Sequence, residues 1–347
     1  MSSNDSMAIT RSMRTTLHSL ASVLPLSTPY TLWVDPCNLC NFRCIFCPTG
    51  HDKLISERPK GKMELTLYRK ILDDLSIFPN RLKRLCLWKD GEPLLHTELS
   101  TMVTLAKEAN IADRVELSTN GVLLTRQKSH ALVDARLDRI QISVEHVHNE
   151  GYRSVTGNFS NYNQIRTNVA ALWEERQRIG VLTPFIQVKM ANSGLTLQEK
   201  DKFISDFEEI VDEVEIIDLS GWSASDAFDF TLGMQPERGY SQANLKKDRI
   251  VCPFPFYALA VNFDGSVSTC CVDWAWHTVV GSVRQESLQS IWNGLRLQAL
   301  RMAHLEDRRN FCAACGSCQY MQGVAPENDL DDARSQLALI YQQPLAP

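Results

Sequence analysis

The uneven distribution of cysteine constrains this chain more than any other feature. Its 347 residues include 11 cysteines, which form one group between Cys37 and Cys47 and a second between Cys252 and Cys318. We expect no export signal, because Pro25 interrupts the apolar stretch near the start, and hence a cytoplasmic protein. Clustered thiols in such a chain are more often metal ligands than a disulfide framework. The sequence therefore predicts two metal centres.

Composition and length narrow the functional classes. The net charge of −5 argues against a nucleic-acid-binding protein held by phosphate contacts. No window approaches the roughly 18 consecutive apolar residues of a membrane span, so we expect no membrane partner. The length allows two domains, or one α/β barrel with an appended module. We expect residues 1–28 to form a flexible N-terminal extension.

The segment between the two cysteine groups alternates short β-type runs with longer helical patterns. The strand candidates, rich in Val, Ile and Leu, are Thr31–Asp35, Arg84–Trp88, Arg114–Ser118, Arg139–Val144, Phe185–Met190 and Glu213–Leu219. The helix candidates are Thr66–Phe78, Glu98–Asn110, Arg126–Asp134, Asn161–Ile179 and Leu197–Ile210. Six such βα repeats imply parallel strands in an open sheet or a barrel, with ligands at the carboxyl ends of the strands.

The C-terminal part has a different pattern. Residues 223–251 accumulate Gly, Ser, Asp and Pro, which predicts a linker or a substrate-side loop. The Asp264-Gly265 pair between Ala258–Val261 and Val267–Thr269 predicts a β-hairpin, and a helix is expected over Leu288–His304. Residues 323–347 form a tail, whose short helix we expect to be solvated or frayed.

The first cysteine group has the spacing C-x3-C-x2-C, with Cys40, Cys44 and Cys47 directly after the first strand. Three thiolates on one loop can hold three irons of a cubane cluster and leave the fourth iron open to the amino and carboxylate groups of another molecule. The alternative is a zinc site that also uses Cys37. Zinc ribbons, however, place a longer segment between their two thiol pairs.

This loop and three later motifs resemble the radical S-adenosylmethionine (radical SAM) superfamily. The turn from Asp90 to Pro93 resembles the Gly-Gly-Glu-Pro turn of the family, with Asp90 in place of the first glycine. Leu117–Gly121 and Ile142–Glu145, the latter followed by Tyr152-Arg153, resemble segments that complete the SAM pocket. The resemblance covers about residues 30–220.

The resemblance implies a partial (β/α)6 barrel over residues 29–222, within an α/β fold. It implies that Cys40, Cys44 and Cys47 hold a [4Fe–4S] cluster, at which SAM is cleaved reductively to a 5′-deoxyadenosyl radical that takes a hydrogen atom from substrate. Glu92, an acid, suits the SAM ammonium group. The implied SAM-binding residues are Phe46, Gly91, Glu92, Pro93, Ser118, Asn120, Ser143 and Arg153.

The second cysteine group, within residues 252–322, is similar to the SPASM/Twitch modules of many radical SAM enzymes. It holds six thiols, whereas two fully ligated cubanes need eight, so we expect one auxiliary [4Fe–4S] cluster. The expected ligands are Cys252, Cys270, Cys312 and Cys315. The choice of Cys271 for Cys270, and of Cys315 with Cys318 as the knuckle, stays open at this point, as does a structural zinc site.

Two enzymatic functions and one non-enzymatic function fit these features. The first is oxidation or epimerisation of a small polar metabolite, such as a sugar, aminocyclitol or nucleotide sugar, with flavodoxin or ferredoxin as electron donor. Lys189 or His148 is the candidate base for a substrate hydroxyl, and Glu145 is a third candidate catalytic residue. The second is modification of a ribosomal peptide, for which residues 1–28 are too short to form a recognition domain. The third is an iron–sulfur electron carrier, which the Glu92 turn argues against.

Overall fold

Six parallel strands form the centre of the fold. The computed structural model describes residues 9–10, 18–159 and 161–343. The strands are β2 (Thr31–Val34), β3 (Arg84–Cys86), β4 (Val115–Thr119), β5 (Arg139–Ser143), β6 (Phe185–Asn192) and β7 (Glu213–Asp218). Each strand pairs in parallel with the next one along the chain. All six predicted strands are present within a few residues, and they form the expected partial (β/α)6 barrel.

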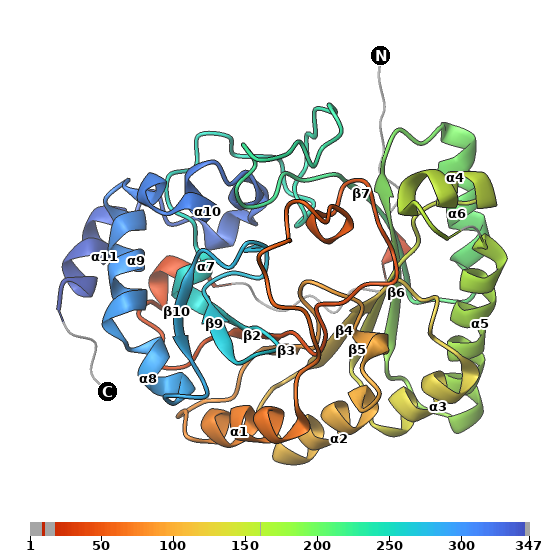
Figure 1. The fold of residues 1–347 in the computed structure, drawn as a ribbon, viewed down its shortest axis with the longest axis horizontal. Coiled ribbons are helices and arrows are strands. Elements are labelled where there is room, and N and C mark those ends of the chain that lie inside the picture. Colours follow the sequence, from red (N-terminus) through yellow and green to blue (C-terminus); the bar gives the residue numbers. More distant parts are fainter. Residues whose placement is uncertain (1–8, 11–17, 160, 344–347) are drawn as a thin grey trace.

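Helices cover the outer face of these strands (Figure 1). They are α1 (Leu65–Ser76), α2 (Leu99–Ala109), α3 (Arg126–Asp134), α4 (Asn149–Thr156), α5 (Tyr162–Ile179) and α6 (Leu197–Phe207). Five of them match the predicted helices, whereas α4 was not predicted. In β5 the side chains of Ile140 and Ile142 are fully buried toward the helices, and those of Arg139, Gln141 and Ser143 alternate with them. The inner face of the barrel is therefore polar.

The C-terminal module continues the same sheet. Its elements are α7 (Phe254–Tyr257), β8 (Ala258–Val261), β9 (Ser266–Ser268), β10 (Val279–Ser282), α8 (Leu288–Trp292), α9 (Leu295–Leu305), α10 (Ala313–Gly316) and α11 (Arg334–Tyr341). Strand β8 pairs in parallel with β2, and β8, β9 and β10 form an antiparallel meander, so the predicted hairpin is confirmed and gains a third strand. At its turn Gly265 has a φ of +94°, which favours glycine.

The predicted helix over Leu288–His304 is instead two helices. Helix α8 ends at Trp292, and Gly294 precedes α9 with an extended backbone. A side chain at Gly294 would meet the Ser290 carbonyl at 2.8 Å. The break turns the two helices against each other and buries Trp292, whose indole donates to the Leu26 carbonyl (2.9 Å).

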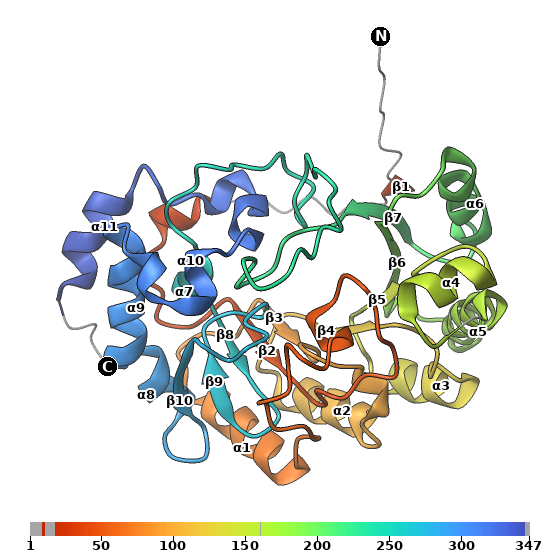
Figure 2. The same ribbon diagram turned by 45° about the horizontal axis from the view of Figure 1, so that its top comes forward.

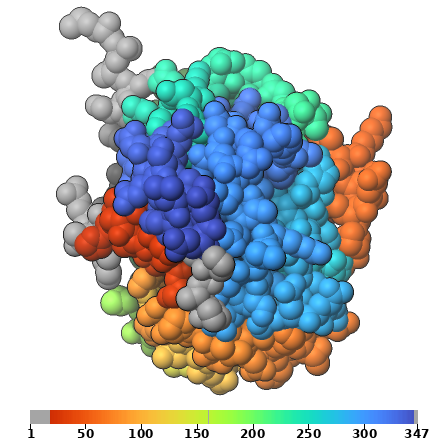
Figure 3. Space-filling view, turned by 90° about the vertical axis from the view of Figure 1, so that its left-hand side faces the viewer, coloured from red at the N-terminus to blue at the C-terminus, as the bar shows by residue number. Residues whose placement is uncertain are grey.

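Residues 18–28 and the C-terminal helix α11 pack on the C-terminal module. Leu337 and Tyr341 of α11 are buried in one cluster with Leu20 and Leu24, so the expected frayed tail is wrong for this helix. The cause is the apolar face of α11, which covers α9. Figure 3 shows these N- and C-terminal segments side by side. Residues 18–28 therefore pack on the module, in contrast to the expected loose extension, whereas residues 1–8 and 11–17 lie outside the described residues.

Shorter elements complete the chain. Strand β1 (Ile9–Thr10) pairs antiparallel with β7 at the sheet edge. The 3-10 helices are η1 (Leu20–Ser22), η2 (Pro48–Gly50), η3 (Pro93–Leu95), η4 (Arg309–Phe311), η5 (Tyr320–Gly323) and η6 (Pro326–Asn328). Among the described residues, no helix is long and apolar enough to cross a membrane.

The segment 223–251 runs from β7 to the C-terminal module (Figure 2). It contains no helix or strand, which agrees with the predicted loop. It is nevertheless packed. Phe230 is buried with Ile55 of the first cysteine loop and Trp274 of the C-terminal module, and the Trp274 indole donates to the Ser223 carbonyl (2.8 Å). The segment therefore connects the two cysteine-bearing regions through an apolar core.

Candidate active site

The loop that follows β2 presents three thiols. Backbone hydrogen bonds fix it on α4, where the amides of Arg43 and Ile45 donate to the carbonyls of Thr156 and Val155 at 2.9 and 3.0 Å. Gly50 closes the loop, since a Cβ there would lie 2.3 Å from the Cys44 carbonyl oxygen. The unpredicted helix α4 is thus the support of the cysteine loop.

The three thiols on this loop influence one another: Cys44 is buried, and Cys40 and Cys47 are half-buried. Burial raises the pKa of each thiol, and that of Cys40 reaches about 12, with a further contribution from Cys47. Three neighbouring thiolates cannot persist in such a setting without positive charge. Soft thiolate ligands on one loop are the donor set of an iron–sulfur cluster, so these residues fit the expected group.

The turn after β3 lies directly on this loop. A Cβ at Gly91 would come within 2.2 Å of the Cys37 carbonyl oxygen, and the Glu92 amide donates to the Leu39 carbonyl at 2.8 Å. Only glycine permits this approach. The resulting contact couples the position of the Gly91 turn to that of the cysteine loop.

Glu92 is a fully engaged buried carboxylate. It accepts hydrogen bonds from the Leu94 amide (2.9 Å), the Thr119 hydroxyl (2.7 Å) and the Asn120 amide (2.8 Å). These donors tie the turn after β3 to the end of β4. A carboxylate offers about four acceptor sites, so Glu92 retains little capacity for a ligand. In this structure Glu92 holds the turn after β3 against the end of β4.

The remaining predicted SAM residues lie around these loops. Asn120 donates from Nδ2 to Asn41 Oδ1 at 2.7 Å, and thereby connects β4 to the cysteine loop. Ser118 of β4 and Ser143 of β5 are half-buried. Phe46 packs against the main core and the buried Pro93 begins η3. Arg153 lies on the exposed face of α4.

Glu145, two residues after β5, and Lys189, in the middle of β6, interact electrostatically. Burial raises the pKa of Glu145 to about 7, and Lys189 opposes this shift. Glu145 also contributes to the raised pKa of Cys40, Cys44 and Cys47, which places it beside the cysteine loop. Burial lowers the pKa of Lys189, against the attraction of Glu145 and Glu215. Two of the three predicted catalytic residues are thus brought together.

His148, the third, occupies a different place. Its Nδ1 accepts the Gly151 amide at the start of α4 (3.0 Å), and its Nε2 lies 3.0 Å from Glu199 Oε1. The adjacent His146 has the same arrangement, with Nδ1 accepting from Val147 and Nε2 3.5 Å from Glu199. These three residues are close enough to hold a metal ion. Because both Nδ1 atoms accept, the ring protons lie on Nε2, and both rings serve as donors to Glu199.

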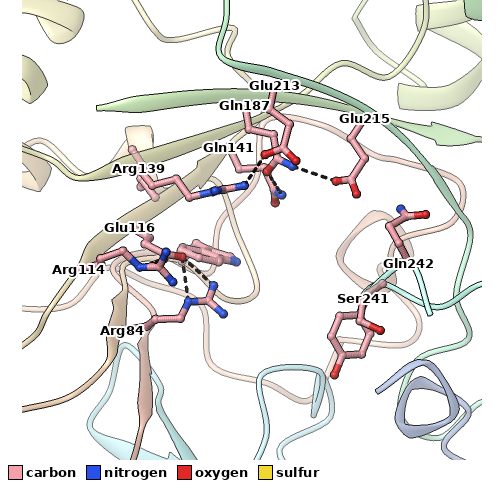
Figure 4. Close-up of a pocket in the computed structure, with 13 residues that line it drawn as sticks. Arg84, Arg114, Glu116, Arg139, Gln141, Gln187, Glu213, Glu215, Ser241 and Gln242 are labelled. Carbon is pink, nitrogen blue, oxygen red and sulfur yellow. Dashed lines mark hydrogen bonds and ion pairs between the residues drawn. The ribbon is translucent and has the colours of Figure 1, made fainter. Parts of the chain in front are cut away.

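A polar cavity of about 310 Å³ lies inside the barrel (Figure 4). Hydrogen bonds run across its wall from Gln141 to Gln187 (2.7 Å) and from Gln187 to Glu215 (2.9 Å). Its lining residues come mainly from the amino-terminal and middle parts of β3 to β7, on the side of the barrel away from the cysteine loop, and from the segment 223–251: Arg84, Trp88, Arg114, Glu116, Leu117, Arg139, Gln141, Gln187, Glu213, Glu215, Tyr240, Ser241 and Gln242. Lys189 is two residues from Gln187 in β6 and interacts with Glu215, which places it between this cavity and Glu145.

A buried charge cluster joins the Gly91 turn to the C-terminal module. Asp90 Oδ2 accepts from Arg58 (2.6 Å), Lys89 (2.8 Å) and the Trp276 indole (3.0 Å), and Lys89 also donates to the Asp273 carbonyl (3.2 Å). The side chains of Asp90, Lys89 and Arg58 are at most 6% exposed. The residue that departs from the family turn is therefore the centre of an interdomain contact.

Asp35 lies in the same cluster and was not singled out by the sequence. It is completely buried, and among the described residues neither carboxylate oxygen has a hydrogen-bond partner. Burial, reinforced by the negative charge of Asp90, raises the pKa of Asp35 to about 7. The sequence around Asp35, a strand that ends in Asp-Pro, does not predict this raised pKa, because the charged residues around Asp35 come from distant segments.

A thiol-lined cavity lies in the C-terminal module. Four cysteines line it, namely Cys252, Cys270, Cys315 and Cys318. Cys271 and Cys312 are not among its lining residues, although each interacts with its neighbour Cys270 or Cys315. The cavity therefore differs from the expected ligand set at one position, with Cys318 in place of Cys312. The donor set of four thiols fits a cubane cluster.

Three comparisons with known proteins agree with this geometry. Residues 34–186 match the family model of the radical SAM superfamily, and residues 252–319 match that of the SPASM iron–sulfur cluster-binding domain. The tungsten-containing aldehyde ferredoxin oxidoreductase cofactor-modifying protein of Pyrococcus furiosus is 33% identical over 114 residues, which are 33% of this chain and 30% of that protein. The chain spans about a third of the length of the curated relatives it matches.

Solved structures of low sequence identity share the fold. BtrN in complex with AdoMet and 2-DOIA has a TM-score of 0.51 at 18% identity, with 83% of this chain and 92% of BtrN covered. Streptococcus suis SuiB bound to its precursor peptide SuiA has a TM-score of 0.60 at 12% identity, with 87% and 73% covered. At such identities the likeness extends to the fold alone.

Proposed function

Because this chain belongs to the radical SAM superfamily and carries a C-terminal SPASM domain, we propose that it oxidises or epimerises a small polar metabolite. The substrate class is a sugar, an aminocyclitol or a nucleotide sugar. The polar interior of the barrel, which runs from this cavity past Lys189 to Glu145 beside the cysteine loop, carries this proposal. The cavity volume of about 310 Å³ is at the lower end for small-molecule sites, and Arg, Glu and Gln side chains line most of the cavity.

The cofactors are SAM and two kinds of [4Fe–4S] cluster, one that binds SAM and one auxiliary. We assign Cys40, Cys44 and Cys47 to the first, and Cys252, Cys270, Cys315 and Cys318 to the second. When bound, these groups supply one-electron reduction, hydrogen-atom abstraction from a substrate carbon and an acceptor for the substrate electron. We further propose a cytoplasmic location, where thiols stay reduced, and flavodoxin or ferredoxin as electron donor.

The chain's own residues position the substrate and move its proton. The Arg84, Arg139 and Gln187 side chains offer donors to substrate hydroxyls. Lys189 lies between the cavity and the cysteine loop, and its lowered pKa increases the fraction of neutral amine. Its Nζ is then the acceptor of a hydroxyl proton, and Glu145 and Glu215 stabilise the ammonium that results. His148 is engaged at the start of α4, so we no longer assign it this role.

The function is tested by anaerobic reconstitution with SAM and a reductant, followed by a screen of polar metabolites for those that raise 5′-deoxyadenosine above background. A sugar, aminocyclitol or nucleotide sugar that is consumed in step with 5′-deoxyadenosine supports the proposal. Stimulation by a peptide alone contradicts it and favours the peptide-modifying function. An enzyme that never consumes SAM under strong reduction contradicts both.

We predict that Lys189→Met lowers turnover of the identified substrate by about 10²- to 10⁴-fold, the usual contribution of a positioned base. The variant is expected to retain SAM cleavage in the absence of substrate, because Lys189 does not hold the cluster. Lys107→Met is the control, since Lys107 lies on α2 and pairs with Asp138 rather than with Glu145 and Glu215. Equal turnover in the two variants would remove Lys189 from the mechanism.

The auxiliary ligand set gives a second prediction. Cys318→Ala is expected to lose the auxiliary cluster, about four irons per chain, whereas Cys312→Ala keeps it. The two residues flank Cys315 at the same spacing, so each variant is the control of the other. Iron content and EPR spectra of anaerobically reconstituted protein measure the result. Loss of iron from Cys312→Ala with retention in Cys318→Ala would restore the ligand set expected from the sequence.

A further inference from the structure

A buried histidine faces the thiol-lined cavity of the C-terminal module. His304 lies in the last turn of α9, has no exposed surface and lines the same cavity as Cys252, Cys270, Cys315 and Cys318. Within the described part of the chain, neither its Nδ1 nor its Nε2 has a hydrogen-bond partner. A buried polar atom without a partner destabilises the folded state, so two such atoms on one ring call for an explanation.

Three other polar side chains that line the cavity, those of Ser223, Asp273 and Thr278, have hydrogen-bond partners of their own, and Ser223 donates to the Val272 carbonyl. The Asp273 carboxylate accepts from the amides of His277 and Thr278 (3.0 and 2.7 Å) and from the Thr278 hydroxyl (2.7 Å). The Thr278 hydroxyl also accepts from the Thr269 amide at 3.2 Å. These neighbours therefore leave the His304 ring without a hydrogen-bond partner. Its imidazole lines the cavity that the auxiliary cluster would occupy.

We propose that His304 donates a hydrogen bond from its ring to a sulfur of the auxiliary cluster. The inference rests on the proposed assignment of that cluster to this cavity. Four thiols already line the cavity and suffice for a cubane, so the imidazole acts as a donor and a positioning residue rather than a fifth ligand. Hydrogen bonds to cluster sulfurs stabilise the added electron and raise the reduction potential.

Hydrogen bonds from two arginine side chains fix the helix that carries His304. Helix α9 is held by the buried Arg301, one turn earlier, which donates to the carbonyls of Pro255 (2.8 Å) and Trp292 (3.1 Å). Arg309 follows α9 and donates to the Cys315 carbonyl. The helix that carries His304 is thus fixed both to the segment after Cys252 and to the Cys315 loop, which keeps the ring at a set position relative to the thiols.

The test is a potentiometric titration, followed by EPR, of the full chain in which Cys40, Cys44 and Cys47 are replaced by Ala so that only the auxiliary cluster contributes. His304→Leu is expected to keep about four irons but to lower the potential, so that at a fixed potential the ratio of reduced to oxidised cluster falls roughly fivefold, as for the loss of one hydrogen bond. His304→Gln, which retains an N–H donor, is expected to restore most of the difference. The exposed His277 offers a control, His277→Leu, with an unchanged potential.

Two outcomes would overturn the inference. Loss of iron, or conversion to a three-iron signal, in both His304→Leu and His304→Gln would make His304 a ligand. An unchanged potential in His304→Leu would leave the ring without the proposed hydrogen bond. If His304→Leu fails to assemble, His304→Met provides a second apolar replacement, judged by the same potential. Absence of any cluster in the parent protein would instead contradict the proposed function.

Discussion

Replacement of Cys40, Cys44 and Cys47 with alanine is expected to abolish reductive cleavage of SAM while the auxiliary cluster remains. The three thiols lie on one loop, whereas the thiols assigned to the auxiliary cluster line a separate cavity in the C-terminal module. Iron should fall from about eight to about four per chain, since each cubane holds four. The measurements are iron content and 5′-deoxyadenosine formed under strong reductant.

The matched control for this prediction is Cys37→Ala. Cys37 is buried next to the same loop, but its thiol donates to the Leu39 carbonyl (3.7 Å) and it contacts the Gly91 turn through its backbone. It should keep both clusters and full SAM cleavage. Equal loss of iron from both sites in the triple variant would show that the clusters do not assemble independently. Tetrahedral zinc at these thiols in anaerobically prepared protein would contradict the cluster altogether.

The sequence predicted most of the barrel because its signals are local. Each parallel strand is a short apolar run, and the loop of Cys40, Cys44 and Cys47 follows the first of them at a fixed spacing. Helix α4 had no such signal, since only two of its eight residues, Tyr152 and Val155, are buried hydrophobic residues, and its N-cap is His148, an unusual residue at that position. The sequence also failed to predict that helix α11 is packed. Its burial depends on Leu20 and Phe256, which are distant in sequence.

The site residues that the sequence missed act through contacts between distant segments. Asp35 and Arg58 join Asp90 across the β2 and β3 loops, and only the fold places them together. The same limit applied to the auxiliary thiols, because Cys312-x2-Cys315 and Cys315-x2-Cys318 have identical spacing. A histidine in a helical pattern such as His304 is ordinarily a core residue, so only its unpartnered nitrogens in a thiol-lined cavity distinguish it.

Asp90→Ala is expected to destabilise the protein by about 3–5 kcal/mol, the usual cost of leaving a buried charge without its partner. The variant removes the carboxylate that receives Arg58, Lys89 and the Trp276 indole, and Lys89 has no exposed side-chain surface. Thermal unfolding under anaerobic conditions measures the loss. The control is Asp52→Ala, which breaks a solvent-exposed ion pair with Arg43 and is expected to leave the unfolding temperature nearly unchanged.

A double variant that also replaces Lys89 distinguishes two effects of Asp90: its charge pairing with Lys89, and its role in holding the Gly91 turn in place. Lys89→Met with Asp90→Ala takes away both charges, so the double variant should recover part of the stability that Asp90→Ala loses. Affinity for SAM should stay weakened in both variants, because Asp90 holds the turn whose next residue, Gly91, lies against the cysteine loop. A double variant no more stable than Asp90→Ala would show that the charges are not coupled. Unchanged SAM affinity would show that the Gly91 turn keeps its position without the contact to Trp276.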